Sequence, residues 1–295
     1  MEKLSILWQF SRPHTIIGST LSILSLFMVA LGTSQSLHLS PAVLPLSLLS
    51  AIACNIYITG LNQWSDVEVD KINKPWLPIP AGVLSKQNAF RIVMFSGLVA
   101  LVASAYLSMP FLGLIASIMA IGTAYSLPPL KLKRSHLLAA SAIAVVRGLL
   151  VNIGFYLHFR HEMMGEWTLT EAIIPLTVFV TAFSLGIAWF KDIPDTEGDA
   201  IYQFGTLAVT SGRQRAFILG VIVVSFAYCY IVFTALIGQL PATRYYSLTH
   251  ISVLSLFLWR AYQLKVFDNQ EVKRFYLFFW GLFFLEYLLY PLGFF

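Results

Sequence analysis

The sequence predicts an all-α integral membrane protein: a bundle of nine transmembrane helices around a central cavity. Three observations predict this fold. Hydrophobic residues make up 58% of the 295 residues and charged residues only 11%, whereas soluble domains carry about a quarter charged residues. Apolar runs long enough to cross a bilayer recur along the whole chain. Basic residues gather in alternate loops between these runs, as the positive-inside rule requires.

Nine runs of the chain approach the length of about 20 mostly apolar residues that a transmembrane helix needs. The third and fourth runs are separated only by Ser108, Met109 and Pro110, which predicts a tight hairpin. We predict one membrane domain over residues 1–295, with these spans: Thr15–Leu31, Ala42–Leu61, Phe90–Leu107, Pro110–Leu127, Leu137–Leu157, Ala172–Phe190, Ala216–Ile237, Tyr246–Tyr262 and Phe275–Leu292.

The distribution of basic residues predicts the orientation of the bundle. With the N-terminus on the cytoplasmic side, all 19 Lys and Arg fall on that side except Arg147, Arg160 and Arg244. Arg147 lies within a span, and the other two fall in outer loops. This asymmetry is the signature of the positive-inside rule. The net charge of +5 therefore reflects membrane topology, and we expect no nucleic-acid partner.

A first acidic motif ends the second span. Asn62, Asp66 and Asp70 are spaced four residues apart, so on a helix they share one face. Two carboxylates and an amide that point the same way form an oxygen-ligand site. Such a site suits Mg²⁺, which commonly takes one or two carboxylates together with substrate phosphates and water.

A second acidic motif ends the sixth span. Asp195 and Asp199 repeat the four-residue interval, and Asp192 lies one turn before Asp195. The corresponding positions of the two motifs predict two pseudo-repeated halves that face one cavity. Pro194 and Gly198 indicate a helix end at which backbone can approach a ligand. Either motif alone is equally well explained as a solvated helix end. Together, so many carboxylates would repel one another without cations, and carboxylates near a membrane are usually functional.

Basic side chains lie on the same side as the motifs. The residues that can hold diphosphate oxygens through charge-assisted hydrogen bonds are Lys71, Lys74, Lys131, Lys133, Arg134 and Lys191. For Lys131 and its neighbours Lys133 and Arg134, an equally good reading is a positive-inside anchor.

Two further residues stand out by position. Arg147 lies about two turns into an apolar span, where an unpaired charge is costly, so we expect it to face the cavity and to pair with a carboxylate or with substrate. Tyr125 lies at the cytoplasmic end of the fourth span.

The two motifs on a nine-span chain resemble the UbiA-type intramembrane aromatic prenyltransferases. Four stretches are similar to the branch that prenylates homogentisate in tocopherol and plastoquinone synthesis: residues 12–15, 62–75, 146–152 and 191–199. The resemblance implies Mg²⁺ ligands at Asp66, Asp70, Asp195 and Asp199, a supporting or proton-removing role for Asp192, a diphosphate contact at Asn62, and further diphosphate contacts at Lys74, Tyr125, Lys131 and Lys191.

The resemblance also implies a reaction and a location. A prenyl diphosphate, phytyl diphosphate as first choice, would ionise in a cavity that excludes water. The homogentisate ring would then attack the allylic cation and lose its carboxylate as carbon dioxide. The partners would be the donor, the acceptor and the lipid bilayer. No presequence is evident before the first span, which favours a cyanobacterial-type thylakoid or plasma membrane.

Two alternatives remain open at this level. The shared motifs describe how diphosphate is handled, so the acceptor can instead be chlorophyllide, a hydroxybenzoate, a dihydroxynaphthoate or haem. A divalent-cation or proton-coupled transporter would also combine carboxylates with a pseudo-repeat, but its site should lie near the bilayer midplane. The carboxylates here lie at helix ends beside lysines, which favours the enzyme.

Overall fold

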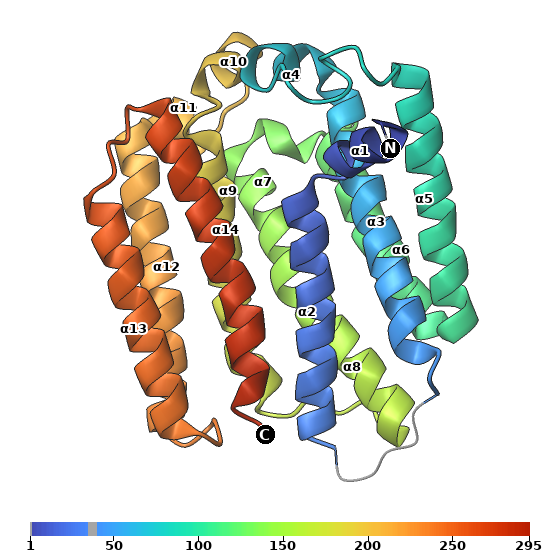
Figure 1. Ribbon diagram of the computed structural model, residues 1–295, viewed down its shortest axis with the longest axis vertical. Helices are drawn as coiled ribbons and strands as arrows, with labels where there is room; N and C mark the ends of the chain where they lie inside the picture. The colour runs from blue at the N-terminus through green and yellow to red at the C-terminus, as the bar shows by residue number, and fades with distance from the viewer. Residues whose placement is uncertain (1, 35–39) are drawn as a thin grey trace.

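The computed structural model describes residues 2–34 and 40–295 as a bundle of long helices joined by short helices and loops (Figure 1). The long helices are α2 (Pro13–Gly32), α3 (Val43–Ser65), α5 (Lys86–Leu107), α6 (Met109–Ser126), the continuous stretch of α7 (His136–Ile143), η2 (Ala144–Leu150) and α8 (Val151–Met164), α9 (Ile173–Asp192), α12 (Arg213–Leu236), α13 (Thr243–Tyr262) and α14 (Asn269–Leu292). The short helices are α1 (Glu2–Phe10), α4 (Val67–Asn73), η1 (Leu132–Arg134), α10 (Thr196–Ile201) and α11 (Leu207–Ser211).

The predicted membrane spans correspond to these long helices. Within the described ranges, eight helical stretches are long and apolar enough to cross a membrane. The ninth predicted span lies in α13, which also has 20 residues but carries Arg244, His250 and several Ser and Thr. The prediction of an all-α integral membrane bundle is therefore confirmed, with nine as an approximate number of spans.

The predicted hairpin between the third and fourth spans is confirmed. Only Ser108 separates α5 from α6. Its hydroxyl oxygen accepts a hydrogen bond from the backbone N–H of Phe111 at 3.3 Å, which satisfies one of the unpaired donors at the start of a helix. Ser85 plays the same role at the start of α5, where it accepts from the backbone N–H of Asn88 at 3.2 Å.

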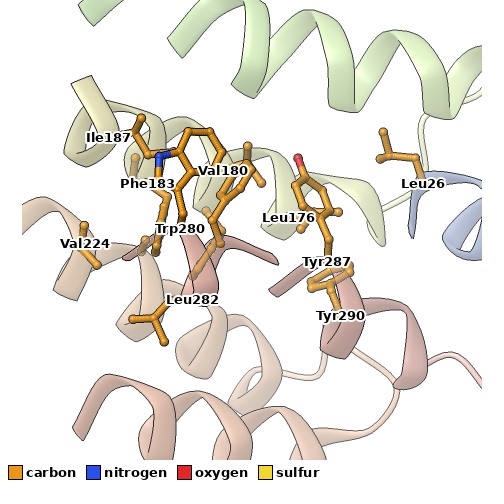
Figure 2. Packing of buried hydrophobic residues seen from close by; sticks show 14 of the residues in the cluster. Leu26, Leu176, Val180, Phe183, Ile187, Val224, Trp280, Leu282, Tyr287 and Tyr290 are labelled. Carbon is orange, nitrogen blue, oxygen red and sulfur yellow. The ribbon is translucent and has the colours of Figure 1, made fainter. Parts of the chain in front are cut away.

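Helix α9 is the central helix of the bundle. Of its most apolar stretch, 72% is buried inside the protein, compared with 28% for α6. Figure 2 shows Val180, Phe183 and Ile187 of α9 near Trp280 of α14, and Leu176 of α9 near Tyr287. Phe183 also stacks on Phe279 with ring centroids 4.1 Å apart. A helix that is apolar all round belongs in the interior, and this one carries the second motif at its end.

The two acidic motifs lie at the same end of the bundle, which we call the motif end. There the short helices α4 and α10 lie side by side (Figure 1). Each follows a long helix, α3 or α9, that ends at a motif. This arrangement agrees with the predicted correspondence between the two halves.

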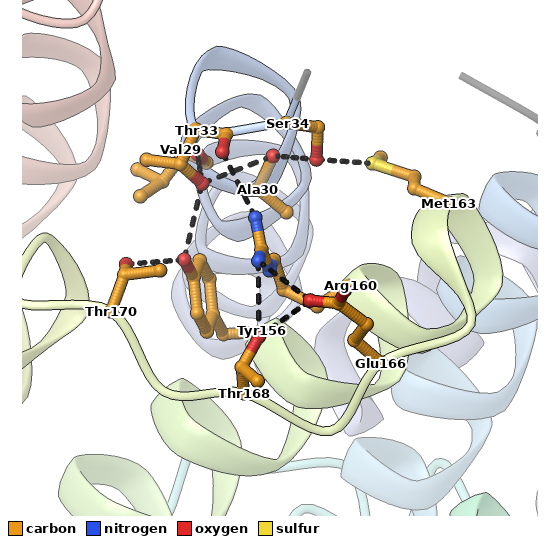
Figure 3. A network of polar contacts seen from close by, with 10 residues as sticks. All are labelled: Val29, Ala30, Thr33, Ser34, Tyr156, Arg160, Met163, Glu166, Thr168 and Thr170. Carbon is orange, nitrogen blue, oxygen red and sulfur yellow. Dashed lines mark hydrogen bonds and ion pairs between the residues drawn. The ribbon is translucent and has the colours of Figure 1, made fainter. Parts of the chain in front are cut away.

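The opposite end is held by a polar network around Arg160 (Figure 3). Arg160 donates to the backbone oxygen of Thr33 at 2.9 Å and to the hydroxyl of Thr168 at 3.0 Å. Tyr156 contacts the hydroxyl of Thr33 at 3.1 Å. These bonds join α8, the end of α2 and the loop before α9. Arg160 therefore stabilises the fold far from the motifs, consistent with its placement in the sequence on the other side.

Candidate active site

The first motif spans the junction between α3 and α4. Asp66 lies between the two helices with φ −107° and ψ 16°. The helical backbone hydrogen bonds continue across it. The Asp66 N–H donates to the backbone oxygen of Asn62 at 3.1 Å, and the Asp70 N–H donates to the backbone oxygen of Asp66 at 2.8 Å. The helical pattern of four-residue intervals therefore continues across the junction between α3 and α4. The Asn62 side-chain amide also donates to the Asp66 carboxylate at 3.2 Å and so orients it.

The second motif spans the junction between α9 and α10. Asp192 is the last residue of α9, and Asp195 precedes the first residue of α10. The Asp199 N–H donates to the backbone oxygen of Asp195 at 3.1 Å. All three aspartates are buried. Burying several carboxylates together is costly unless cations or donors face them.

Asn73 joins the two motifs. Its side-chain oxygen accepts from the Gly198 N–H at 3.0 Å, and its side-chain nitrogen donates to the Asp199 carboxylate at 3.3 Å. A Cβ atom at Gly198 would lie 2.4 Å from the Asn73 oxygen. We expected Gly198 to let a ligand approach the backbone. In the structure that space is taken by Asn73, so here glycine is needed for contact between α4 and α10.

The motifs face one cavity of about 60 Å³, which we call the motif cavity. Five predicted aspartates line it, together with Asn62, Lys74, Tyr125 and Lys191. The other lining residues are Arg12, Val69, Asn73, Lys133, Ala139, Phe204 and Thr206. Glu68 and Glu197, also within the motifs, are exposed. Lys71 pairs with Glu68 at 2.9 Å on the surface.

Three lysines from different segments face the aspartates. Lys133 pairs with Asp66 at 2.6 Å, and Lys74 forms an ion pair with Asp195. Lys191 lies 3.4 Å from the Asp192 carboxylate, and its ammonium donates to the Tyr125 hydroxyl at 3.4 Å. The cavity therefore offers carboxylates for a cation and ammonium groups for phosphate oxygens.

The loop after α6 places Lys133, not Lys131, in the motif cavity. Lys131 has left-handed backbone angles (φ 40°, ψ 54°), and its ammonium lies over the Phe204 ring at 5.5 Å. The loop is fixed by backbone hydrogen bonds between Gly205 and both Arg134 and His136, at 2.8 and 3.0 Å. Arg134 is exposed. Of the three basic residues in this loop, only Lys133 is buried.

Comparison with known proteins shows what this arrangement belongs to. The UbiA prenyltransferase family matches residues 22–283. The chain belongs to the UbiA prenyltransferase family. The family is that of a prenyltransferase, so the enzyme prediction is confirmed and the transporter alternative is set aside.

Relatives and solved structures of this family cover nearly the whole chain. The homogentisate phytyltransferase of Synechocystis sp. is 42% identical over 99% of this chain and 96% of its own length. The chloroplastic homogentisate solanesyltransferase of Arabidopsis thaliana is 38% identical over 96% of this chain and 75% of its own length. A structure of a UbiA homolog from Archaeoglobus fulgidus bound to GPP and Mg²⁺ shares the fold, with a TM-score of 0.69 and 16% identity over 98% of this chain and 99% of that one.

Burial sets the charge state of this prenyltransferase's motif cavity. Burial, reinforced by Asp192 and Asp195, raises the pKa of Asp199 to about 7. Burial also raises the pKa of Asp70, although Lys74 and Arg12 act in the opposite direction. For Lys133, burial lowers the pKa to about 8 despite the opposing effect of Asp66. Crowded, desolvated carboxylates resist ionisation unless more positive charge reaches them.

The donor set of the motif cavity fits Mg²⁺. One buried oxygen of Asp70, Oδ2, has no hydrogen-bond partner among the described residues. Within residues 2–34 and 40–295, no three potential ligands are already gathered into a metal cluster. The unpaired Asp70 oxygen suits a cation whose coordination is completed by substrate phosphates and water, as is usual for Mg²⁺. Asp66, Asp70, Asp195 and Asp199 would hold it.

Two further cavities lead away from the motif cavity. The middle cavity, about 190 Å³, shares Arg12, Asn62, Tyr125 and Lys191 with the motif cavity. The inner cavity, about 150 Å³, shares Ile58, Thr59, Val146 and Arg147 with the middle cavity. The three cavities therefore form a series from the motif end into the bundle.

Arg147 lies where the middle and inner cavities meet. Its guanidinium carbon lies 4.9 Å from the centroid of the Trp280 ring and 5.3 Å from that of Phe283. We expected a carboxylate or substrate as its partner. Among the described residues no carboxylate lies within ion-pair distance of it.

Arg12, Lys133 and Asn73 all line the motif cavity. None of them was predicted as a site residue, although Lys133 belongs to the group of basic residues that can hold diphosphate. Each lies in or beside a stretch that was noted: Arg12 and Asn73 in segments similar to the homogentisate branch, and Lys133 in the basic loop. Their position in or beside these segments was therefore the signal in the sequence that could have identified them. What was missing was the direction in which each side chain points, which depends on distant contacts.

Proposed function

We propose that this enzyme transfers a prenyl group, with phytyl favoured, from a prenyl diphosphate to homogentisate, with loss of carbon dioxide and dependence on Mg²⁺. The bond between prenyl C1 and the diphosphate oxygen breaks, and a bond between C1 and a ring carbon forms. The products are a prenylated methylbenzoquinol, carbon dioxide and diphosphate, and one proton is consumed. This places the protein in prenylquinone synthesis of the tocopherol and plastoquinone type.

One observation carries the proposal. Five aspartates from two distant helix ends, four of them buried and Asp66 half-buried, share a cavity with Lys74, Lys133 and Lys191. Carboxylates alone would favour a bare cation, and lysines alone would favour a bare anion. Their combination favours a cation bound together with a diphosphate.

Some residues of the site would bind the diphosphate, and others would orient the carboxylates of the two motifs. Asn62 orients the Asp66 carboxylate, and Asn73 holds the second motif against the first. Lys74, Lys133, Lys191 and Tyr125 would hold diphosphate oxygens. Bound Mg²⁺ would supply Lewis-acid neutralisation of the leaving diphosphate.

The middle cavity suits the reacting carbon atoms. It adjoins the motif cavity, and Tyr276 and Trp280 line it. Aromatic faces attract a cation, so they would stabilise an allylic cation. Enclosure by the bundle would keep water from capturing that cation.

The choice of acceptor and donor draws on the relatives. Proteins named as homogentisate phytyltransferase and solanesyltransferase resemble the chain over nearly its full length, which supports homogentisate as acceptor. Their donors differ in length, so the preference for phytyl follows the greater identity to the Synechocystis enzyme. The same relative supports a cyanobacterial-type thylakoid or plasma membrane. The placement of basic residues supports a cytoplasmic N-terminus and motif end.

A crossed assay of the purified full chain with Mg²⁺ tests the function. Homogentisate, 4-hydroxybenzoate and chlorophyllide are each combined with phytyl, geranylgeranyl and solanesyl diphosphates. Ring-labelled acceptor is followed into lipid product, and carboxyl-labelled homogentisate is followed into carbon dioxide. We expect product and carbon dioxide with homogentisate, and the highest kcat/KM with the phytyl donor. Product only with another acceptor would overturn the acceptor and retain prenyl transfer.

A further inference from the structure

Arg147 is a charged residue in the middle of an otherwise apolar membrane segment. It contacts the middle and inner cavities but does not line the motif cavity. In the described part of the chain it faces two aromatic rings and no carboxylate. Aromatic faces compensate a desolvated guanidinium only in part, so a cation at this depth indicates an anionic ligand.

The backbone that carries Arg147 is held in place by specific contacts. Residues 144–150 form a π-helical segment, a feature that frequently marks functional sites. The Asn152 side chain donates to the backbone oxygens of Arg147 and Gly148, each at 2.8 Å. The hydroxyl of Tyr287 donates to Asn152 at 3.1 Å. Figure 2 shows Tyr287 and Trp280 on α14, the helix that supplies both the hydroxyl and one aromatic face.

Close packing against α9 adds to this fixation. A Cβ atom at Gly148 would lie 2.2 Å from the Thr181 hydroxyl oxygen. Helix α9 therefore approaches the π-helical segment as closely as glycine permits. The guanidinium is presented to the cavities from a backbone that cannot easily shift.

The substrates offer two anionic groups that Arg147 could meet. The donor diphosphate is matched by the lysines of the motif cavity, whose wall Arg147 does not reach. The prenyl tail is uncharged and would leave the guanidinium uncompensated. The remaining group is the carboxylate of an aromatic acid, whose two oxygens fit the planar fork of a guanidinium.

We propose that Arg147 binds the carboxylate of the aromatic acceptor and thereby selects acceptors that carry one. The acceptor ring then lies in the middle cavity, between the guanidinium and the motif cavity that holds the donor diphosphate. Trp280 forms one wall of this subsite. The inference rests on the proposed function only in taking the acceptor to be an aromatic acid.

Equilibrium binding to the detergent-purified full chain tests this subsite. The probes are homogentisate, 4-hydroxybenzoate and the methyl ester of each, with Mg²⁺ and a non-reactive thiolo analogue of geranylgeranyl diphosphate present. The variants are Arg147→Gln, Arg147→Lys and the control Arg244→Gln, which removes an exposed arginine at the opposite end. Affinity for the donor analogue and the thermal unfolding temperature are measured for each protein.

We expect the unaltered chain to bind an acid more tightly than its ester, by on the order of ten- to a hundredfold, as for a lost hydrogen bond to a charged group. Arg147→Gln should abolish this preference, because it should weaken the binding of the acid and leave the binding of the ester unchanged. Arg147→Lys should keep part of it, because the charge remains and the fork is lost. Arg244→Gln should leave it unchanged. If Arg147→Gln does not fold, the reduced preference of Arg147→Lys carries the test.

Three results would overturn the proposal. The unaltered chain could bind no acid more tightly than its ester, or Arg147→Gln could weaken the binding of acid and ester equally. In the third result, Arg147→Gln would lose affinity for the donor analogue and keep its affinity for the acid. The last would assign Arg147 to the diphosphate. Failure of the proposed function gives a different pattern. The chain would then ignore homogentisate and still show an Arg147-dependent preference for 4-hydroxybenzoate over its ester.

Discussion

Lys133 and Asp66 form an ion pair of 2.6 Å that joins the loop after α6 to the junction of α3 and α4. Lys133 also donates to the Ser65 hydroxyl at 2.6 Å and is only 6% exposed. On the other side of the motif cavity, Lys74 pairs with Asp195. Each acidic motif is thus faced by a lysine from another segment. We infer that these lysines provide positive charge for the carboxylates and for a diphosphate bound among them.

Replacing Lys133 with methionine should impair donor binding more than folding. The variant keeps the length of the side chain but removes the charge that faces Asp66, leaving that carboxylate without its partner. We expect affinity for the donor analogue in Mg²⁺ to fall by roughly tenfold or more, the cost of losing a hydrogen bond to a charged group. Equilibrium binding and initial rates measure this effect.

Lys131→Met is the matched control for that variant. It removes the same charge two residues away, from a side chain that lies over Phe204. We expect its donor affinity to stay within a few-fold of the unaltered chain, since exposed or half-exposed charges contribute little. An equal loss in the two variants would mean that only the overall charge of the loop matters.

Asp66→Ala and Asp195→Ala should each abolish turnover and leave the membrane fold intact. Each removes a proposed Mg²⁺ ligand and unpairs one lysine, but each also relieves repulsion between carboxylates and opens no apolar core. Glu68→Gln and Glu197→Gln are the matched controls, because both glutamates lie within the motifs but are exposed. Mg²⁺-dependent turnover and thermal unfolding are measured together. Full activity in either aspartate variant would reject that residue as a ligand.

Asn73 and Gly198 should be energetically coupled. Gly198→Ala alone places a Cβ atom 2.4 Å from the Asn73 oxygen, which pushes α4 and α10 apart. Asn73→Ala alone removes the two hydrogen bonds between them. In the double variant the small alanine at 73 leaves room for the Cβ, so the second substitution should cost little.

The coupling between Asn73 and Gly198 is measured as a double-mutant cycle on Mg²⁺-dependent binding of the donor analogue. We expect each single variant to weaken binding by roughly tenfold, about the free energy of one or two hydrogen bonds. Simple additivity of the two effects would show that Asn73 does not occupy the space over Gly198 in solution.

The raised pKa of Asp199, about 7, predicts a defined pH dependence. A carboxyl whose pKa is raised by folding holds its proton more tightly in the folded state. The stability from that proton is complete below the ordinary carboxyl pKa of about 4 and is lost as pH rises through about 7. Thermal stability in a chelator should therefore fall from pH 5 to pH 8, while apparent Mg²⁺ affinity rises because the ion needs the ionised carboxylate.

Asp199→Asn provides the check on this assignment. An amide does not titrate, so the variant should lose much of the pH dependence of stability between pH 5 and pH 8. A pH profile that matches that of the unaltered chain would assign the titration to another group, such as Asp70, whose pKa burial also raises.

Asn152 should affect binding of the acceptor indirectly, because it holds the backbone of Arg147. Asn152→Leu frees the backbone oxygens of Arg147 and Gly148, and Tyr287→Phe removes only the hydroxyl that orients Asn152. We expect the KM for homogentisate to rise in both variants, more in the first, with the KM for the donor unchanged. A purely structural role would lower kcat and stability without this difference between the two substrates.

The sequence by itself determined the membrane class, the positions of the spans and the two acidic motifs. These features can be read locally. Hydropathy is a sum over about 20 neighbouring residues, and the four-residue spacing of Asn62, Asp66 and Asp70 follows from helix geometry alone. The helix break at Asp66 did not disturb that spacing, because the hydrogen bonds continue across it.

Only the tertiary structure decided which neighbouring residues face the cavity. Lys131 and Lys133 are indistinguishable by composition, yet backbone bonds from Gly205 fix the loop so that Lys133 meets Asp66. Asn73 acquires its role from Gly198, 125 residues away in the chain. Arg147 was identified from the sequence by the cost of a charge in an apolar span, but its aromatic neighbours come from α14. Such contacts join distant segments, so no local pattern encodes them.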